Sequence, residues 1–175
     1  ETFDHSQLKV YADKVVYRGI EARQIIFCEG HLVKNNPFFN WIPLKPAKGE
    51  VFTVKIPRLQ FVNAIFNRNG FVMDLGDGLY KVGATYAWDD LTEDLTEAGA
   101  LELNDKLKKM TDCPYEVTRH EAGIRPSSSD RRPIIGQHPL HKNLFVFNGL
   151  GTKGVMLAPF FAGNFVNFYL QKEDI

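Results

Sequence analysis

Three glycines between two apolar segments constrain the fold of this chain more than any other feature. Gly149, Gly151 and Gly154 spell G-x-G-x-x-G between the strand-like residues 143–147 and the apolar, helix-like residues 155–170. In such a strand–turn–helix unit the glycines let the backbone approach a ligand, and the helix N-terminus offers free N–H groups to an anion. A tight turn that binds nothing would have the same spacing, so both interpretations stay open.

The same spacing matches a dinucleotide-binding fingerprint, but the rest of that unit is missing. A dinucleotide-binding βαβ unit needs a second strand after the helix and an acidic residue about 20 positions on. Glu173 and Asp174 have roughly that offset, but no strand pattern accompanies them. A kinase glycine loop also matches, with Val155 in place, but no V-A-I-K, H-R-D or D-F-G motif follows. We therefore reject the pyrophosphate-binding interpretation of this turn.

The charge balance excludes several classes of partner. The chain has 175 residues, of which 21 are basic and 21 acidic, and 44% are hydrophobic. These fractions are typical of a folded domain, and zero net charge is not the basic footprint of a nucleic-acid-binding protein. No run of about eighteen apolar residues is present, and the polar residues 1–9 do not resemble a signal peptide. We therefore expect a cytoplasmic protein with no nucleic-acid partner and no membrane insertion.

The sequence also allows expectations about disulfides, metal binding and the completeness of the chain. Cys28 and Cys113 lie far apart and form no C-x-x-C pair, which predicts reduced, buried thiols without a disulfide. His138 and His141 lack further ligands at metal spacing, so we expect no metal site. The chain opens with a glutamate instead of a methionine, and we expect it to be a fragment.

Hydrophobic periodicity predicts several strands and few helices. One helix is indicated by four apolar residues that share a face, namely Ala100, Leu103, Leu107 and Met110. Thr96 is its expected N-cap, and Pro114 closes the segment. The apolar residues 25–28 are typical of a strand buried on both faces of a parallel sheet. The other strand-like segments are a hairpin over 8–17, a strand over 50–56 and a hairpin over 71–86.

The stretch 121–136, E-A-G-I-R-P-S-S-S-D-R-R-P-I-I-G, is far more specific than the glycine turn that follows it. Its pattern G-x-R-P-x-x-x-D-x-x-P-x-I-G, followed by a strand, a glycine turn and a final helix, resembles the C-terminal end of the flavin-dependent amine and amino-acid oxidases. That family includes enzymes of the D-amino-acid oxidase, glycine oxidase and sarcosine oxidase type. Three upstream pieces agree with it in the same order: I-F-C-E-G at 26–30, P-A-K-G-E at 46–50 and V-G-A-T-Y at 82–86.

The resemblance implies the fold class and a division of the chain. The expected fold is α/β (mixed α+β), with a largely antiparallel substrate-domain sheet beside the C-terminal remnant of a Rossmann-like domain that binds FAD. Residues 1–30 are expected to be the trailing part of the FAD-binding domain, 31–120 the substrate-binding domain, and 121–175 the return to the FAD-binding domain. The strands over 25–28 and 144–147 should then lie in one sheet.

The resemblance also implies a function. The chain would be part of an FAD-dependent oxidoreductase that oxidises a C–N bond of an amine or amino acid by hydride transfer to flavin. FAD would belong to the full-length parent and be absent from this chain, which alone would be inactive. The substrate would be a small amine or amino acid, with no electron acceptor identified. The alternative is a non-catalytic binding or interaction domain that keeps the fold and lacks the cofactor.

Particular residues take roles from the same resemblance. Arg125 would hold the substrate carboxylate in a forked pair, for which guanidinium geometry is suited, and Tyr86 would lie near the substrate. A strand tyrosine and an exposed arginine are the structural alternatives for these two residues. The expected cofactor-binding residues are Gly30, Arg125, Pro126, Gly149, Leu150, Gly151, Thr152, Lys153 and Gly154. Lys153 could equally face solvent, and we expect Lys48 to have a structural role at the start of its strand.

Overall fold

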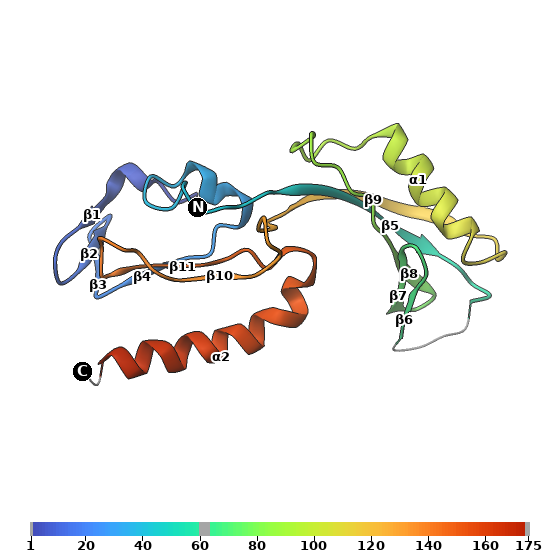
Figure 1. Ribbon diagram of the computed structural model, residues 1–175. Coiled ribbons are helices and arrows are strands. Elements are labelled where there is room, and N and C mark those ends of the chain that lie inside the picture. Colours follow the sequence, from blue (N-terminus) through green and yellow to red (C-terminus); the bar gives the residue numbers. More distant parts are fainter. Residues whose placement is uncertain (1, 60–63, 174–175) are drawn as a thin grey trace. The chain divides into compact units, whose positions relative to one another are not determined.

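The computed structural model describes residues 2–59 and 64–173, which form two compact units (Figure 1). The terminal unit comprises Glu1–Pro46 and Arg125–Ile175, and the central unit comprises Ala47–Ile124. The chain therefore crosses between units after Pro46 and after Ile124, whereas the sequence predicted boundaries after residues 30 and 120. Mixed strands and helices give the α/β (mixed α+β) architecture expected from the sequence.

The central unit is built on one five-stranded sheet. Its strand order is β6-β7-β8-β5-β9, and the strands are β5 (Ala47–Lys55), β6 (Ile65–Asn67), β7 (Phe71–Gly76), β8 (Leu79–Gly83) and β9 (Glu116–Arg125). The predicted hairpin is confirmed, with Val72 opposite Val82, although β8 ends at Gly83 rather than near residue 86. β5 pairs antiparallel with β8, so it lies in the interior of the sheet.

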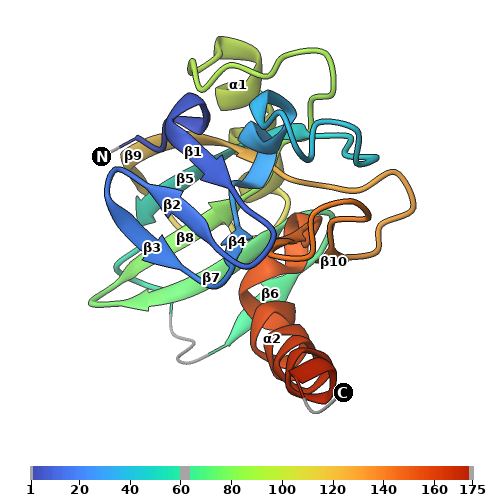
Figure 2. The same ribbon diagram turned by 90° about the vertical axis from the view of Figure 1, so that its left-hand side faces the viewer.

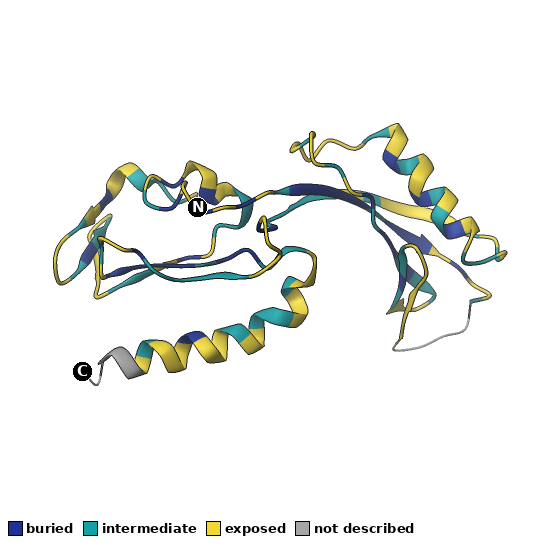
Figure 3. Cartoon of the chain, in the orientation of Figure 1, coloured by how far each residue is buried: buried dark blue, intermediate teal, exposed yellow. Residues whose placement is uncertain are grey.

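A single helix, α1 (Glu97–Lys108), packs against the sheet of the central unit. The Thr96 side chain accepts a hydrogen bond from the Gly99 N–H, which confirms the predicted N-cap. Leu103 and Leu107 are fully buried, and they join Phe52, Val54 and other strand residues in one hydrophobic core. The burial pattern in Figure 3 shows the two sides of α1, one buried and one exposed.

The terminal unit contains two three-stranded sheets. The first is β1-β2-β3, formed by β1 (Leu8–Val10), β2 (Val15–Tyr17) and β3 (Ile20–Ala22), and it contains the predicted hairpin. The second is β10-β11-β4, formed by β10 (Ile134–Gln137), β11 (Leu144–Asn148) and β4 (Ile25–Phe27). β4 and β11 pair in parallel with Phe145 opposite Ile26, which confirms that segments far apart in the sequence share a sheet.

Two burial predictions are wrong, one for the strand β4 and one for the two cysteines. Ile26 is 46% exposed because β4 is the last strand of its sheet and Phe27, not Ile26, faces the core. Cys28, just after β4, is exposed, and Cys113 is only partly buried, although both thiols are free as expected. An apolar run indicates which residues favour burial, but whether they are buried depends on the elements that pack against them.

A long helix, α2 (Gly154–Glu173), runs beside the β10-β11-β4 sheet (Figures 1 and 2). Phe165 is buried there, with its ring 5.7 Å from that of Phe145 and 6.2 Å from that of Phe147. Most other described side chains of α2 are exposed, including Val166 and Phe168. Three short 3₁₀ helices complete the unit: η1 (His5–Gln7), η2 (Gly30–Asn35) and η3 (Gly151–Lys153). Among the described residues, no helix has the length and apolar character needed to cross a membrane.

Candidate functional site

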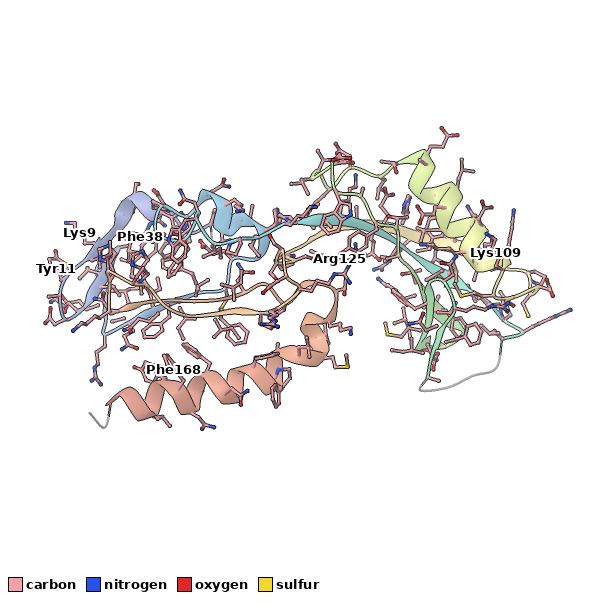
Figure 4. All side chains as sticks on the ribbon, in the orientation of Figure 1. Lys9, Tyr11, Phe38, Lys109, Arg125 and Phe168 are labelled. Carbon is pink, nitrogen blue, oxygen red and sulfur yellow. The ribbon has the colours of Figure 1, made fainter. Side chains whose placement is uncertain are left out.

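The segment that follows β9 lies directly against the glycine turn. Ser127 forms an isolated antiparallel bridge with Leu150, and the Gly151 N–H donates to the Pro126 carbonyl at 3.3 Å. Arg125, the last residue of β9, is partly buried and precedes these contacts by one position (Figure 4). The predicted residues Arg125, Pro126, Leu150 and Gly151 are therefore brought together within the terminal unit.

Two glycines of the turn have backbone conformations that other residues rarely adopt. Gly149 has φ +73° and Gly151 has φ +56°. A methyl group added to Gly149 would lie 2.9 Å from the Ile134 backbone nitrogen, so β10 leaves no space for a larger residue. The tight packing of β10 against the turn thus accounts for Gly149 without any ligand. At Gly154, by contrast, an added methyl group would meet only Leu150 at an ordinary distance of 3.5 Å.

Gly30 is held against the start of the same turn. The side chain of Asn148 makes two hydrogen bonds. Its NH2 group donates to the Gly30 carbonyl at 2.8 Å, and its Oδ1 accepts from the Gly149 N–H at 2.8 Å. Asn148 is almost fully buried, and its bond with the Gly149 N–H is buried as well. The residue before the glycine turn therefore fixes the ends of two segments that are 118 positions apart in sequence.

The helix α2 begins directly after η3, next to the glycine turn. Leu150, the residue before η3, makes no side-chain capping bond, and Thr152 and Lys153 are exposed. Val155, in the first turn of α2, is 98% exposed. The first N–H groups of a helix have no partner within it and carry partial positive charge. A helix start of this kind is suited to an electron-rich group, and the neighbouring Arg125 carries a planar, permanently charged guanidinium.

Tyr86, the other predicted substrate residue, belongs to the central unit. Its side chain is 46% exposed, and its ring centroid lies 5.0 Å from that of Trp88. The backbone of this segment continues the sheet for a short distance, because Lys48 and Ala87 form an isolated antiparallel bridge. Sequence reasoning missed Trp88, although its position two residues after Tyr86 was a signal that the two rings could lie together.

Lys48 and Glu50 form two buried charged sites on β5. The Lys48 ammonium donates to the Asp90 carboxylate at 2.5 Å, which supports the structural role expected of this lysine. Glu50 accepts from the Thr96 N–H at 3.1 Å and from the Thr96 hydroxyl at 2.6 Å. His120 Nε2 lies 2.7 Å from Glu50 Oε2 without hydrogen-bond alignment. The sequence contained the K-x-E spacing, but it carried no signal for the partners on a distant segment.

These contacts determine the pKa values of the two acids. Burial by itself raises the pKa of the Glu50 carboxyl group, but the Thr96 hydrogen bonds and His120 outweigh it, and the pKa lies below its ordinary value. The Lys48 hydrogen bond, followed by the bonds from Thr92, lowers the pKa of Asp90 to about 2. Both carboxylates are therefore ionised at neutral pH and act as acceptors, not as proton donors.

His138 has a structural role in the turn between β10 and β11. The Leu140 and His141 N–H groups both donate to His138 Nδ1 at 3.1 Å, so this nitrogen caps the turn between β10 and β11. Burial, followed by the nearby His141, lowers the pKa of His138. Within residues 2–59 and 64–173, no group of three or more histidine, cysteine or acidic side chains is arranged to hold a metal ion.

Comparisons with known proteins give one coherent family. Residues 4–166 match the sequence profile of the DAO family, described as FAD dependent oxidoreductase. Glycine oxidase from Bacillus subtilis (strain 168) is 26% identical over 158 residues, which cover 87% of this chain and 42% of the relative. The chain thus spans less than half the length of that curated relative.

Solved structures share the fold. Glycine oxidase from Bacillus cereus ATCC 14579 superposes with a TM-score of 0.76 at 19% identity, covering 95% of this chain and 48% of that one. Iminodiacetate oxidase from Chelativorans sp. BNC1 superposes with a TM-score of 0.72 at 23% identity, covering 88% and 45%. At these identities the likeness concerns the fold, and in both cases about half of the solved chain has no counterpart here.

Proposed function

Because the chain belongs to the family of FAD-dependent oxidoreductases, we propose that it is part of a flavoenzyme that oxidises a C–N bond of an amino acid or another carboxylated amine. The observation that carries the proposal is the contact of the Arg125–Ser127 segment with the glycine turn just before α2. This contact puts a candidate carboxylate-binding group beside a candidate cofactor-binding backbone. The names of the relatives, glycine oxidase and iminodiacetate oxidase, are consistent with a carboxylated substrate.

The cofactor is proposed to meet the backbone of the glycine turn. The N–H groups at the start of α2 would donate to the electron-rich edge of the flavin, and Lys153 would add positive charge there. Gly30 and Pro126 would line the same place, since both hydrogen-bond to residues of the turn region. FAD, when bound, supplies the redox chemistry by accepting a hydride equivalent from the substrate.

Arg125 is proposed to bind and orient the substrate. Its guanidinium would form two parallel hydrogen bonds to the substrate carboxylate, which fixes both the position and the rotation of the bound molecule. Fixing the carboxylate aims the substrate Cα–H toward the flavin, and orientation of this kind supplies a large part of enzymatic rate enhancement.

We propose that the chain is one part of a longer flavoprotein. The apolar, exposed side chains of α2 are expected to be covered in that protein, because large exposed apolar surfaces mark interaction sites. The 175-residue chain alone should therefore bind FAD weakly or not at all and be inactive. Gel filtration after incubation with FAD measures this directly, and co-elution of stoichiometric flavin with the chain would contradict it.

Replacing Arg125 by Lys in the flavin-loaded protein tests the substrate assignment. The change keeps the charge but removes the planar fork, which should cost about 2–4 kcal/mol, or roughly 30- to 1000-fold in kcat/KM, for an amino-acid substrate. The rate for the decarboxylated analogue should change little, because that molecule never makes the pair. Flavin reduction rates for the two substrates provide the comparison.

Arg131→Lys is the matched control, because Arg131 is an exposed arginine in the loop of the same motif. It should leave both rates unchanged. Equal losses on both substrates in Arg125→Lys would mean that Arg125 supports the fold or the cofactor, and the carboxylate role would have to be abandoned.

A further inference from the structure

Lys48 is a buried charge that the proposed chemistry does not use. Its side chain is 1% exposed, although an ammonium group is costly to remove from water unless it is paired and hydrogen-bonded. The pairing is with Asp90 at 2.5 Å, and Thr92 Oγ1 lies 3.5 Å from the same nitrogen. Asp90 itself is partly exposed on the segment between β8 and α1. The buried lysine therefore reaches out to hold a surface segment.

That segment is held at two points by the same residue. The Lys48 N–H donates to the Ala87 carbonyl at 2.8 Å, and the Ala87 N–H donates to the Lys48 carbonyl at 3.0 Å. Three residues later the Asp90 side chain binds the Lys48 ammonium and also accepts from the Thr92 N–H at 2.9 Å. The backbone of Lys48 thus fixes position 87, and its side chain fixes position 90.

Tyr86 and Trp88 flank Ala87 on the segment that Lys48 holds at positions 87 and 90. Partners across an antiparallel bridge point to the same side of a sheet and successive residues alternate, so Ala87 shares the side of Lys48. Tyr86, next to Ala87, therefore projects to the opposite side, and the ring contact keeps Trp88 beside it. On β5 the side of Lys48 also carries Phe52, which packs in the core beneath α1, so the two aromatics lie on the side away from α1.

The two rings form an ordered, exposed aromatic surface. Their centroids are 5.0 Å apart with an interplanar angle of 56°, and Trp88 is 43% exposed. Aromatic surfaces of this kind bind the apolar and cationic parts of small molecules. Both rings belong to the segment between β8 and α1, and the Lys48–Asp90 pair holds the part of that segment just after Trp88.

We propose that Lys48 is a positioning residue that acts through Asp90 to hold Tyr86 and Trp88 as an aromatic wall of the central unit that binds the apolar or cationic part of a small-molecule substrate. The substrate part of this inference rests on the proposed function, whereas the positioning part concerns the central unit alone. Glu50, two residues along β5, has a different task, because it binds Thr96 at the start of α1. This difference gives a matched control within the same strand.

The positioning part can be measured without turnover. The chain has two tryptophans, so Trp41→Phe leaves Trp88 as the single reporter. In this background Lys48→Met should raise the acrylamide quenching of Trp88 and lower its fluorescence anisotropy, and Lys48→Arg should restore both toward the parent values. Asp90→Asn, on the partly exposed partner, should change Trp88 in the same direction and is the variant to use if Lys48→Met does not fold.

Glu50→Gln is expected to lower the melting temperature of the central unit while leaving the quenching of Trp88 unchanged. Unchanged quenching and anisotropy in folded Asp90→Asn or Lys48→Met protein would overturn the positioning role. An equal change in Glu50→Gln would also overturn it, because the effect would then report general loosening of the central unit.

The substrate part has a separate readout in the flavin-loaded protein. Asp90→Asn should raise KM with little change in kcat, the signature of lost binding that is equal in ground and transition states. A loosened Trp88 with an unchanged KM would overturn the aromatic wall, even if Arg125→Lys behaves as the proposed function requires. Failure of the Arg125 test with a raised KM in Asp90→Asn would instead count against the carboxylate assignment alone.

Discussion

The central and terminal units each contain a helix beside a sheet, but they cover these helices to very different degrees. In the central unit, Leu103 and Leu107 of α1 are fully buried in one core with the strands. In the terminal unit, Phe165 is the buried hydrophobic residue among the described side chains of α2, which carries many exposed apolar residues along its length (Figure 3). The apolar composition of a helix therefore does not predict how many of its side chains are buried, because burial depends on what packs against each face.

The two tryptophans allow this comparison to be tested, since Trp41 lies in the terminal unit and Trp88 in the central unit. Each single-tryptophan variant, Trp88→Phe or Trp41→Phe, reports the unfolding of one unit in urea. Separate midpoints are expected, because the buried residues form two distinct clusters and proteins with several compact units often depart from two-state unfolding.

The largest difference is expected from core truncations in the two helices. Leu103→Ala should lower the free energy of unfolding of the central unit by about 2–5 kcal/mol, because a fully buried leucine leaves a cavity. Val166→Ala, on the exposed face of α2, should change the stability of the terminal unit by about 0.5 kcal/mol or less. Urea midpoints read from Trp88 and Trp41 give both values. If both reporters shift equally in Leu103→Ala, the two units unfold together and the comparison fails.

A smaller effect should separate two glycines within the terminal unit. Gly149→Ala should destabilise the unit by about 1–3 kcal/mol, because φ is positive and the added methyl group meets the Ile134 backbone. Gly163→Ala should be neutral or stabilising by about 0.5–1 kcal/mol, because no atom lies within 4 Å of the new methyl group in the helix. Thermal melts followed by Trp41 emission compare the two variants. A neutral Gly149→Ala would show that β10 shifts to make room.

The smallest expected effect is a difference in acid sensitivity. The lowered pKa of His138 means that its neutral form is favoured in the folded terminal unit, so stability is present above its ordinary pKa of 6.5 and is lost as the pH falls below it. The lowered pKa of Glu50 in the central unit contributes stability that is lost only as the pH falls below about 4.5. Between these values Trp41 should report loosening and Trp88 should not.

His138→Asn provides the control for this titration, because an asparagine oxygen can still accept from the turn N–H groups but does not titrate in this range. The melting temperature reported by Trp41 should become less dependent on pH in this variant. Parallel pH profiles for wild type and His138→Asn would assign the acid sensitivity to other groups.

Local patterns predicted the elements whose residues carry their own signal. The α1 helix had a 3.6-residue apolar period and a threonine cap, and the first hairpin had two β-rich runs around a turn. The strand β9 was missed, because E-V-T-R-H-E-A-G-I-R contains few apolar residues and no clean alternation. It is a strand because β5 lies beside it in the sheet, which is information from the neighbour rather than from the segment.

The candidate site likewise combines residues that a motif identified with contacts that only the fold creates. The sequence motif identified Arg125 and Pro126, and it was the fold that brought Pro126 and Ser127 against Leu150 and Gly151. Asn148, which joins Gly30 to the glycine turn, had no distinguishing pattern. The Lys48–Asp90 pair joins residues 42 positions apart, and many other acids were equally available as partners by charge.

By itself, the sequence determined the family, the order of the motifs and the residue types that the chemistry needs. Glycines with positive φ, a capped amphipathic helix and a planar arginine are local properties, and each can be derived from the residue and its near neighbours. Only the tertiary structure decided which faces are covered, which charge meets Lys48 and why Gly149 cannot carry a side chain. These are contacts between distant segments, and their energy depends on the atoms that folding places beside each residue.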